Sequence, residues 1–247
     1  MRVFCNRPGV IARCILLFLA LFLSAHSDVI LSADDADDIL RELHLLSAQI
    51  HGSNDLPTQS FAAYALGLKS ATLAELLSKE VAAHGDPEDL MIATTVQGAA
   101  EVGVVIHWSG EHQRYYYDGA AFRRYLELAP SGSRAADSWF RIIEQGFYYS
   151  KDLDRDSLAS AAAQKQEFLT NYPSYEKAGK IGIYLSIDYR DLWRSCRDTG
   201  DLECAACYLE LAQDILQGIS SNYSDTNTGD VAARMLMRIE KEMGEQK

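Results

Sequence analysis

Residues 124–131 read RYLELAPS and residues 167–174, 43 positions further on, read EFLTNYPS, so the chain contains a repeated phrase. Each copy runs from helix-favouring apolar residues into a Pro-Ser turn, and a small residue, Ala135 or Ala178, follows each turn. Proline and serine are typical of turns and of helix starts. A weaker third copy, GISSNYS at residues 218–224, precedes Ala232 after a longer loop. The phrase therefore predicts a repeated unit of two helices joined by a turn.

Apolar residues in the second half of the chain recur every three or four positions, as on one face of a helix. One series runs from Tyr175 to Cys196 and the next from Leu202 to Ile219, with Gly200-Asp201 between them. An antiparallel helical hairpin is expected there. We find no strand alternation, and the prolines mark further helix starts. The predicted helices are 35–51, 58–84, 87–108, 111–129, 132–150, 155–172, 174–199, 201–222 and 228–244.

Composition excludes several classes of protein. The chain has 247 residues, a net charge of −12 and 48% apolar residues, which is ordinary for a globular protein and excludes wholesale disorder. The excess of acidic residues argues against nucleic-acid binding, which needs Lys and Arg to neutralise phosphates. Stacked helical pairs bury the faces that one pair leaves exposed. We therefore expect an all-α, right-handed solenoid of antiparallel helical hairpins, with about nine helices.

The first 27 residues are predicted to be a secretory signal peptide. Arg2, Arg7 and Arg13 precede an apolar run over residues 14–25, and small residues at Ala25 and Ser27 suit a cut before Asp28. This run is too short to span a bilayer, which needs about 20 residues, although an uncleaved anchor stays an alternative. No later segment is long and apolar enough to cross a membrane, so we expect an exported protein, periplasmic or secreted.

The repeated phrases, together with Gly200-Asp201-Leu202 and Ala205, resemble tetratricopeptide (TPR) repeats. More narrowly, they resemble the subtype in periplasmic proteins of the outer-membrane assembly lipoprotein and Tol-Pal-associated kind. The resemblance covers about residues 87–244 and implies a TPR-like domain over 87–247, preceded by a helical cap or degenerate repeat over 28–86. It also implies a protein or peptide partner in the envelope of a diderm bacterium. The spacing of 43 residues exceeds the usual 34, and no lipid-accepting Cys follows the leader.

Three cysteines lie beyond the leader. Cys196 and Cys204 each stand four residues from Gly200, so an antiparallel hairpin would place them side by side. An exported protein meets an oxidising compartment, which makes a Cys196–Cys204 disulfide plausible. Burial of the thiols as small apolar groups is the alternative. A redox role for Cys204-x-x-Cys207 is disfavoured because no βαβ context surrounds it, and a zinc site because no fourth ligand lies nearby.

No catalytic, cofactor or metal site is predicted. The six histidines form neither a His-x-x-x-His pair nor a His-Glu-x-x-His motif, and neither a nucleophile elbow nor a phosphate-binding loop occurs. The acidic run over residues 34–38 lacks the central Gly and closing Glu of a calcium loop. We interpret it as the charged start of helix 35–51.

Aromatic residues gather in the middle of the chain. Three consecutive tyrosines, Tyr115–Tyr117, cannot all face one core if they lie on a helix, where each position turns by about 100°. At least one ring of this set is therefore expected to be exposed or to line a groove, and the concave side of the solenoid is where such rings would anchor a partner. Packing between repeats is the alternative for any single ring. The candidate groove residues are Tyr116, Trp139, Tyr148 and Tyr184.

These observations favour an exported, non-catalytic adaptor that binds a protein or peptide partner along its concave face. The acidic surface would favour a basic partner. One alternative is a helical enzyme that acts on the cell wall through paired carboxylates. The other is an inert spacer subunit of an envelope complex.

Overall fold

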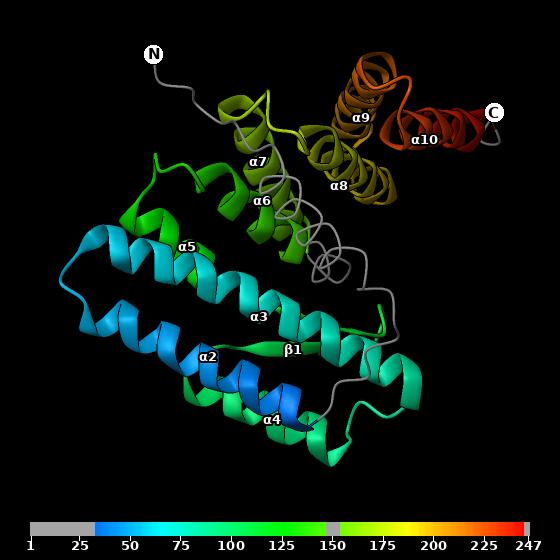
Figure 1. Cartoon of the computed structure of the whole chain (residues 1–247). Helices are drawn as coiled ribbons and strands as arrows, with labels where there is room; N and C mark the ends of the chain where they lie inside the picture. Colours follow the sequence, from blue (N-terminus) through cyan, green and yellow to red (C-terminus); the bar gives the residue numbers. More distant parts are fainter. Residues whose placement is uncertain (1–32, 147–153, 245–247) are drawn as a thin grey trace, which may run out of the picture.

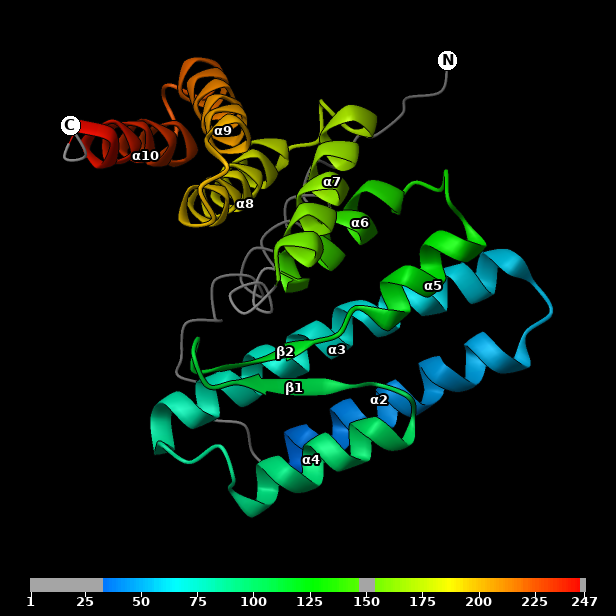
Figure 2. The same cartoon turned by 180° about the vertical axis from the view of Figure 1, so that it is seen from behind.

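The computed structural model describes residues 33–146 and 154–244, and Figures 1 and 2 show it from opposite sides. The predicted signal peptide, residues 1–27, and Tyr148 lie outside the described residues. The described part contains nine helices and one β-hairpin, which confirms an all-α, solenoid-like fold with one local exception. In chain order the elements are α2 (Ala33–Gly52), α3 (Leu56–His84), α4 (Leu90–Glu101), β1 (Ile106–Ser109), β2 (Arg114–Tyr117), α5 (Ala120–Leu128), α6 (Ala135–Gly146), α7 (Arg155–Asn171), α8 (Ala178–Asp198), α9 (Leu202–Asn222) and α10 (Asn227–Gly244).

Aspartates cap four of the helices at their N-termini. Asp55, Asp89, Asp154 and Asp201 precede α3, α4, α7 and α9, and each side chain accepts a hydrogen bond from a backbone N–H of the first turn. The helix expected from residue 87 starts at Leu90, because Asp89 provides the cap. Each cap satisfies an N–H group that has no partner inside its helix.

The β-hairpin is a correction to the predicted helices 87–108 and 111–129. α4 ends before Gly103, which adopts a φ of 79°, and β1 then pairs with β2 in antiparallel register, Trp108 opposite Tyr115. Residues 104–108 (VVIHW) and 114–117 (RYYY) are rich in the β-branched and aromatic types that favour strands. This strand propensity is the signal that helical periodicity overlooked.

The repeated phrase corresponds to one recurring turn. The N–H groups of Ala129, Tyr172 and Tyr223 donate to the carbonyl oxygens four residues earlier, at 2.8, 2.8 and 2.9 Å. Buried Ala135 and Ala178 then begin α6 and α8. The third copy differs, because α9 ends at Asn222 and α10 begins at Asn227. The loop after this copy is therefore shorter than the loops after the first two copies, and the predicted longer loop is wrong. The 43-residue offset therefore marks equivalent helix ends.

From α7 onward each helix packs mainly against its neighbours in the chain, whereas α5 packs mainly on α3 and α4 on α2. One core includes buried side chains of α2 to α5 and the hairpin, and extends from Ala36 to Ala135. A smaller cluster, centred on Phe140 and Phe168, joins α6, α7 and α8, and a further core runs through α7 to α10. Figures 1 and 2 show the resulting layers, with α2, α3 and α4 at one end and α9 and α10 at the other. None of the described helices has the length and apolar composition that a bilayer crossing needs.

Candidate functional site: a charged cleft between α3, the hairpin and α6

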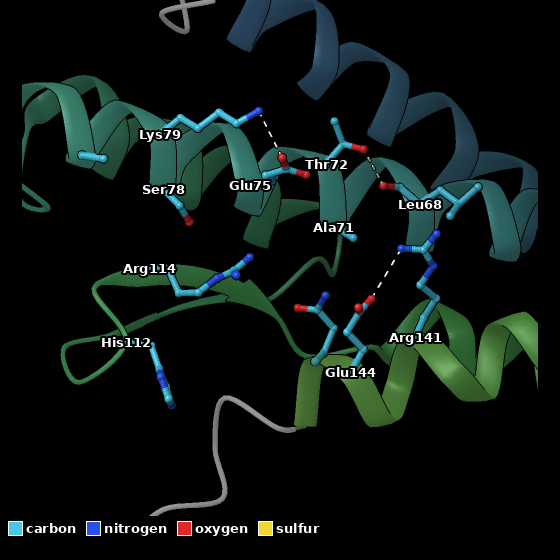
Figure 3. Close-up of a pocket in the computed structure, with 12 residues that line it drawn as sticks. Leu68, Ala71, Thr72, Glu75, Ser78, Lys79, His112, Arg114, Arg141 and Glu144 are labelled. Atoms are coloured by element: carbon cyan, nitrogen blue, oxygen red, sulfur yellow. Dashed lines mark hydrogen bonds and ion pairs between the residues drawn. The ribbon is translucent and has the colours of Figure 1, made fainter. Parts of the chain in front are cut away.

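A pocket of about 670 Å³ opens between α3, the β-hairpin and α6 (Figure 3). We call it the α3–α6 cleft. Its walls come from three elements that are far apart in the sequence. The lining residues are Leu68, Ala71, Thr72, Glu75, Ser78, Lys79, Ala82, His112, Arg114, Arg141, Glu144 and Gln145.

Two polar side chains hold β2 in place between the helices. One edge of β2 pairs with β1, so the other edge needs partners for its backbone groups. The N–H of Tyr115 donates to Ser78 Oγ at 2.8 Å, and the N–H of Tyr117 donates to Gln145 Oε1 at 3.2 Å. Ser78 belongs to α3 and Gln145 to α6, so the strand bridges the two helices and closes one side of the cleft.

Charged side chains face the cleft from all three walls. Lys79 Nζ lies 3.1 Å from Glu75 Oε1 on α3, and Arg141 Nη1 lies 3.6 Å from Glu144 Oε2 on α6. Arg114 extends from β2 toward α3 (Figure 3). Positive groups therefore outnumber negative ones in the cleft, although the whole chain carries a net charge of −12.

A second pocket, of about 360 Å³, adjoins the cleft because Arg141 and Glu144 line both. Phe140 is one of its lining residues, with Lys177 Nζ 4.9 Å and Lys180 Nζ 5.7 Å from the ring centroid. Lys180 also forms an ion pair with Glu144. Burial lowers the pKa of Lys180, but the hydrogen bond and charge of Glu144 together with Tyr184 outweigh burial and raise that pKa above its usual value. The charged surface thus continues from α6 to the start of α8.

Asp137 connects the two sides of the cleft. Its carboxylate accepts hydrogen bonds from the Tyr64 hydroxyl of α3 at 2.7 Å and from the Tyr175 hydroxyl, just before α8, at 2.6 Å. Burial raises the pKa of Asp137, but the two tyrosine hydrogen bonds and the charges of Arg141 and Lys177 together outweigh it and hold that pKa below its usual value. Burial and the hydrogen bond to Asp137 together raise the pKa of Tyr64 to about 12. Asp137 therefore fixes the position of α6 relative to α3.

The three predicted groove aromatics that fall within the described residues do not line this cleft. Tyr115, Tyr116 and Tyr117 lie on a strand, and all three are buried, with Tyr116 only 9% exposed. The expectation that one ring of this set must face solvent is wrong, because it assumed a helix. Trp139 packs in the cluster that joins α6, α7 and α8, and half-buried Tyr184 lies beside Lys180.

Cys196 and Cys204 form a disulfide across the turn between α8 and α9, with their Cα atoms 5.8 Å apart. This is the pair that the position of Gly200 predicts, and Gly200 adopts a φ of 80° there. Cys207 is an exposed free thiol. Within the described ranges, no group of three or more His, Cys, Asp and Glu side chains could hold a metal ion.

No spacing in the sequence points to the cleft residues. Lys79, Arg114 and Arg141 lie on a helix, a strand and another helix, so no linear motif unites them. Arg114 reaches the cleft only through the hairpin, which the helical interpretation of residues 87–129 excluded.

No family model matches the chain, and no curated protein matches it in sequence. The crystal structure of the de novo designed helical repeat protein DHR64 is 20% identical, covers 87% of this chain and 95% of its own, and has a TM-score of 0.28. The DHF58 filament is 15% identical, covers 86% and 94%, and has a TM-score of 0.27. The class of the protein therefore rests on its own helices and turns, which define an all-α, solenoid-like chain.

Proposed function

We propose that this protein is a non-catalytic interaction scaffold and that it binds a segment of a partner protein in the α3–α6 cleft. The observation that carries the proposal is the cleft itself, a hollow whose walls present charged side chains from three elements. A helical stack offers a rigid, extended surface for such binding. An inert spacer would have no reason to keep a charged hollow of this kind.

The pairing of the carboxylates favours binding over hydrolysis. A hydrolase with paired carboxylates turns both carboxyl groups toward the substrate bond that it cleaves. In the cleft, Glu75 forms an ion pair with Lys79, and Glu144 forms ion pairs with Lys180 and Arg141. Side chains arranged in this way suit the recognition of a partner's charged groups. The cell-wall enzyme is therefore the less favoured function.

The charge distribution suggests the chemistry of the partner. The acidic chain as a whole attracts a basic protein over long range. Inside the cleft, Lys79, Arg114 and Arg141 favour an acidic group, while Glu75 favours a basic one. The segment we propose is therefore polar and of mixed charge, on a partner that is basic overall.

We further propose that the protein acts outside the cytoplasm, in the envelope of a bacterium with two membranes. The leader pattern over residues 1–27 supports export, and a disulfide suits an oxidising compartment. N-terminal sequencing of the protein from a periplasmic fraction tests this setting. A mature chain that begins at Asp28 would support it, and recovery of the intact chain from the cytosol would contradict it.

Two single substitutions test the role of the cleft. Lys79→Glu reverses an exposed cation that pairs with Glu75 within α3, and Arg124→Glu reverses one that pairs with Glu127 within α5. Only Lys79 lines the cleft. The partner is first captured with the wild-type protein from envelope extracts, identified by mass spectrometry and purified.

Titration of the purified partner by calorimetry then compares the variants. We expect Lys79→Glu to weaken binding by about tenfold and Arg124→Glu by less than about twofold. Equal affinities for both variants would exclude the cleft as the binding site. Digestion of purified cell-wall glycan by the wild type, lost in Glu75→Gln, would favour the enzyme instead.

A further inference from the structure

Three sulfur atoms lie around the first turn of α9. Cys196, near the end of α8, is completely buried, and its disulfide partner Cys204 is only partly buried. Cys207 follows Cys204 by three residues on α9 and carries an exposed thiol. A thiol that approaches this disulfide from solvent therefore reaches the Cys204 sulfur and not that of Cys196.

The surroundings of Cys204 favour the approach of a negatively charged thiolate to its sulfur. Arg155 Nη2, at the start of α7, donates a hydrogen bond to Cys204 Sγ at 2.8 Å and lies 3.7 Å from Asp201 Oδ2. Asp201 caps α9 by accepting the N–H of Cys204 at 3.1 Å. Cys204 thus stands at a helix N-terminus and beside a guanidinium, two positive features that attract an incoming thiolate and stabilise the negative charge of the exchange transition state.

Cys207 is placed to react with the same sulfur. Residues three apart on an α-helix have Cα atoms about 5 Å apart, from the helical rise and radius. That separation falls inside the range of about 4.4–6.8 Å found for disulfides. A Cys204–Cys207 disulfide therefore requires adjustment only in the first two turns of α9, where Cys204 precedes the regular helical hydrogen bonds.

We propose that Cys204 is an exchange centre, whose disulfide moves between Cys196 and Cys207 within one chain. The Cys207 thiol loses its proton to solvent, and its sulfur attacks Cys204 Sγ. The Cys204–Cys207 bond forms while the Cys196–Cys204 bond breaks. The electron pair leaves with the Cys196 sulfur, which takes up a proton. The exchange needs neither an oxidant nor a reductant, because one disulfide and one thiol are present before and after.

The exchange opens the cross-link between α8 and α9 without unfolding them. Cys196 belongs to a small core with Trp193 and Ala205, and this packing persists when the sulfur is a thiol. The turn at Gly200 is then held by packing and by its backbone hydrogen bonds, such as that from the Asp201 N–H to the Cys196 carbonyl oxygen. Because the number of free thiols stays constant, counting thiols cannot detect the exchange.

Tryptic mapping distinguishes the two forms. Trypsin releases Cys196 in the tripeptide of residues 195–197, and it releases Cys204 and Cys207 together in residues 198–234. The full-length chain with Cys5→Ser and Cys14→Ser is incubated without added thiol at pH 8, and its free thiols are blocked with iodoacetamide before digestion. The exchanged form is seen as an alkylated tripeptide with an internal disulfide in the long peptide. We expect it in at least about 1% of chains.

Variants separate the role of each group. Cys207→Ser must abolish the exchanged form and leave the tripeptide linked to residues 198–234. Arg155→Met should slow the approach to equilibrium by roughly fivefold, the effect of one half-exposed charge, whereas Arg155→Lys should retain most of the rate. Absence of the alkylated tripeptide after a day, with all label on Cys207, would overturn the proposal. An unchanged rate in Arg155→Met would remove Arg155 from it.

Discussion

Lys165 and Asp188 form an ion pair that is almost completely buried between α7 and α8, with side chains 5% and 2% exposed. Lys165 also donates to the carbonyl oxygen of Ala161 at 3.4 Å. Burial raises the pKa of Asp188 above its usual value, although the charge of Lys165 opposes this effect. Removing both charges from water is costly, so the pair adds little stability over apolar residues but penalises the loss of one partner.

A double-mutant comparison tests this interpretation of the pair. Lys165→Met leaves an unpaired carboxyl group in the core and should lower the free energy of unfolding by about 3–5 kcal/mol. Adding Asp188→Leu should recover most of that loss. Urea unfolding followed by circular dichroism measures both changes. The variant with Asp188→Leu alone completes the comparison. If the loss in the double variant equals the sum of the losses in the two single variants, the side chains act independently.

The raised pKa of Asp188 also predicts a pH dependence. A carboxyl group whose pKa is higher in the folded than in the unfolded state binds more protons when folded, so its contribution to stability rises as the pH falls. Without Lys165, the protonated form is favoured further. The stability loss in Lys165→Met should therefore be smaller at pH 4.5 than at pH 7. An equal loss at both pH values, measured in the same urea experiment, would contradict this assignment.

The helices from residue 154 onward follow local signals closely. Predicted helices 155–172, 201–222 and 228–244 agree with α7, α9 and α10 to within one residue at each end. A capping Asp begins α7 and α9, and the repeated turn ends them. The hairpin escaped detection because its strands are only four residues long and lie between helix-favouring segments. Short strands depend on partners that local periodicity does not reveal.

Two glycines near the α8–α9 hairpin predict opposite effects of the same substitution. Gly200 adopts a φ of 80°, which strains any residue with a Cβ atom, so Gly200→Ala should destabilise the protein by about 1–2 kcal/mol. Gly218 lies inside α9, and a Cβ atom added there would meet open space. Gly218→Ala should therefore stabilise the protein by about 0.5–1 kcal/mol. Thermal unfolding of both variants checks the signs. Stabilisation by Gly200→Ala would refute the left-handed turn.

Across the whole molecule, Asp137 couples the core of α2 to α5 with the helices that follow. Its carboxylate accepts hydrogen bonds from the hydroxyl groups of Tyr64 and Tyr175, which come from the two sides of this junction. Arg141 lies 3.6 Å from it and also lines the cleft. The shape of the cleft therefore depends on contacts between residues that are 38 and 73 positions apart.

Asp137→Ala should disturb this junction while leaving the helices intact. The substitution removes the acceptor of two partly buried hydroxyl groups, so we expect a loss of about 1–3 kcal/mol in unfolding free energy. Hydrogen exchange should increase in α6 and at the start of α8, with little change in α9 and α10. Helix content by circular dichroism is the control. Uniform exchange increases along the whole chain would mean that the junction does not act locally.

Local chemistry was sufficient to predict the helical class, the recurring turn and the paired cysteines. The signals for these features act over only a few positions, so each can be recognised in the sequence. They are the Pro-Ser turns, the Asp caps, Gly200 and the periodicity of three to four residues. The hairpin and the α3–α6 cleft required the folded chain. Ser78 and Gln145 satisfy β2 from two different helices, and the strand held there brings Arg114 to the cleft that Lys79 and Arg141 also line. Contacts between distant residues depend on how elements pack, and packing leaves no regular spacing in the sequence.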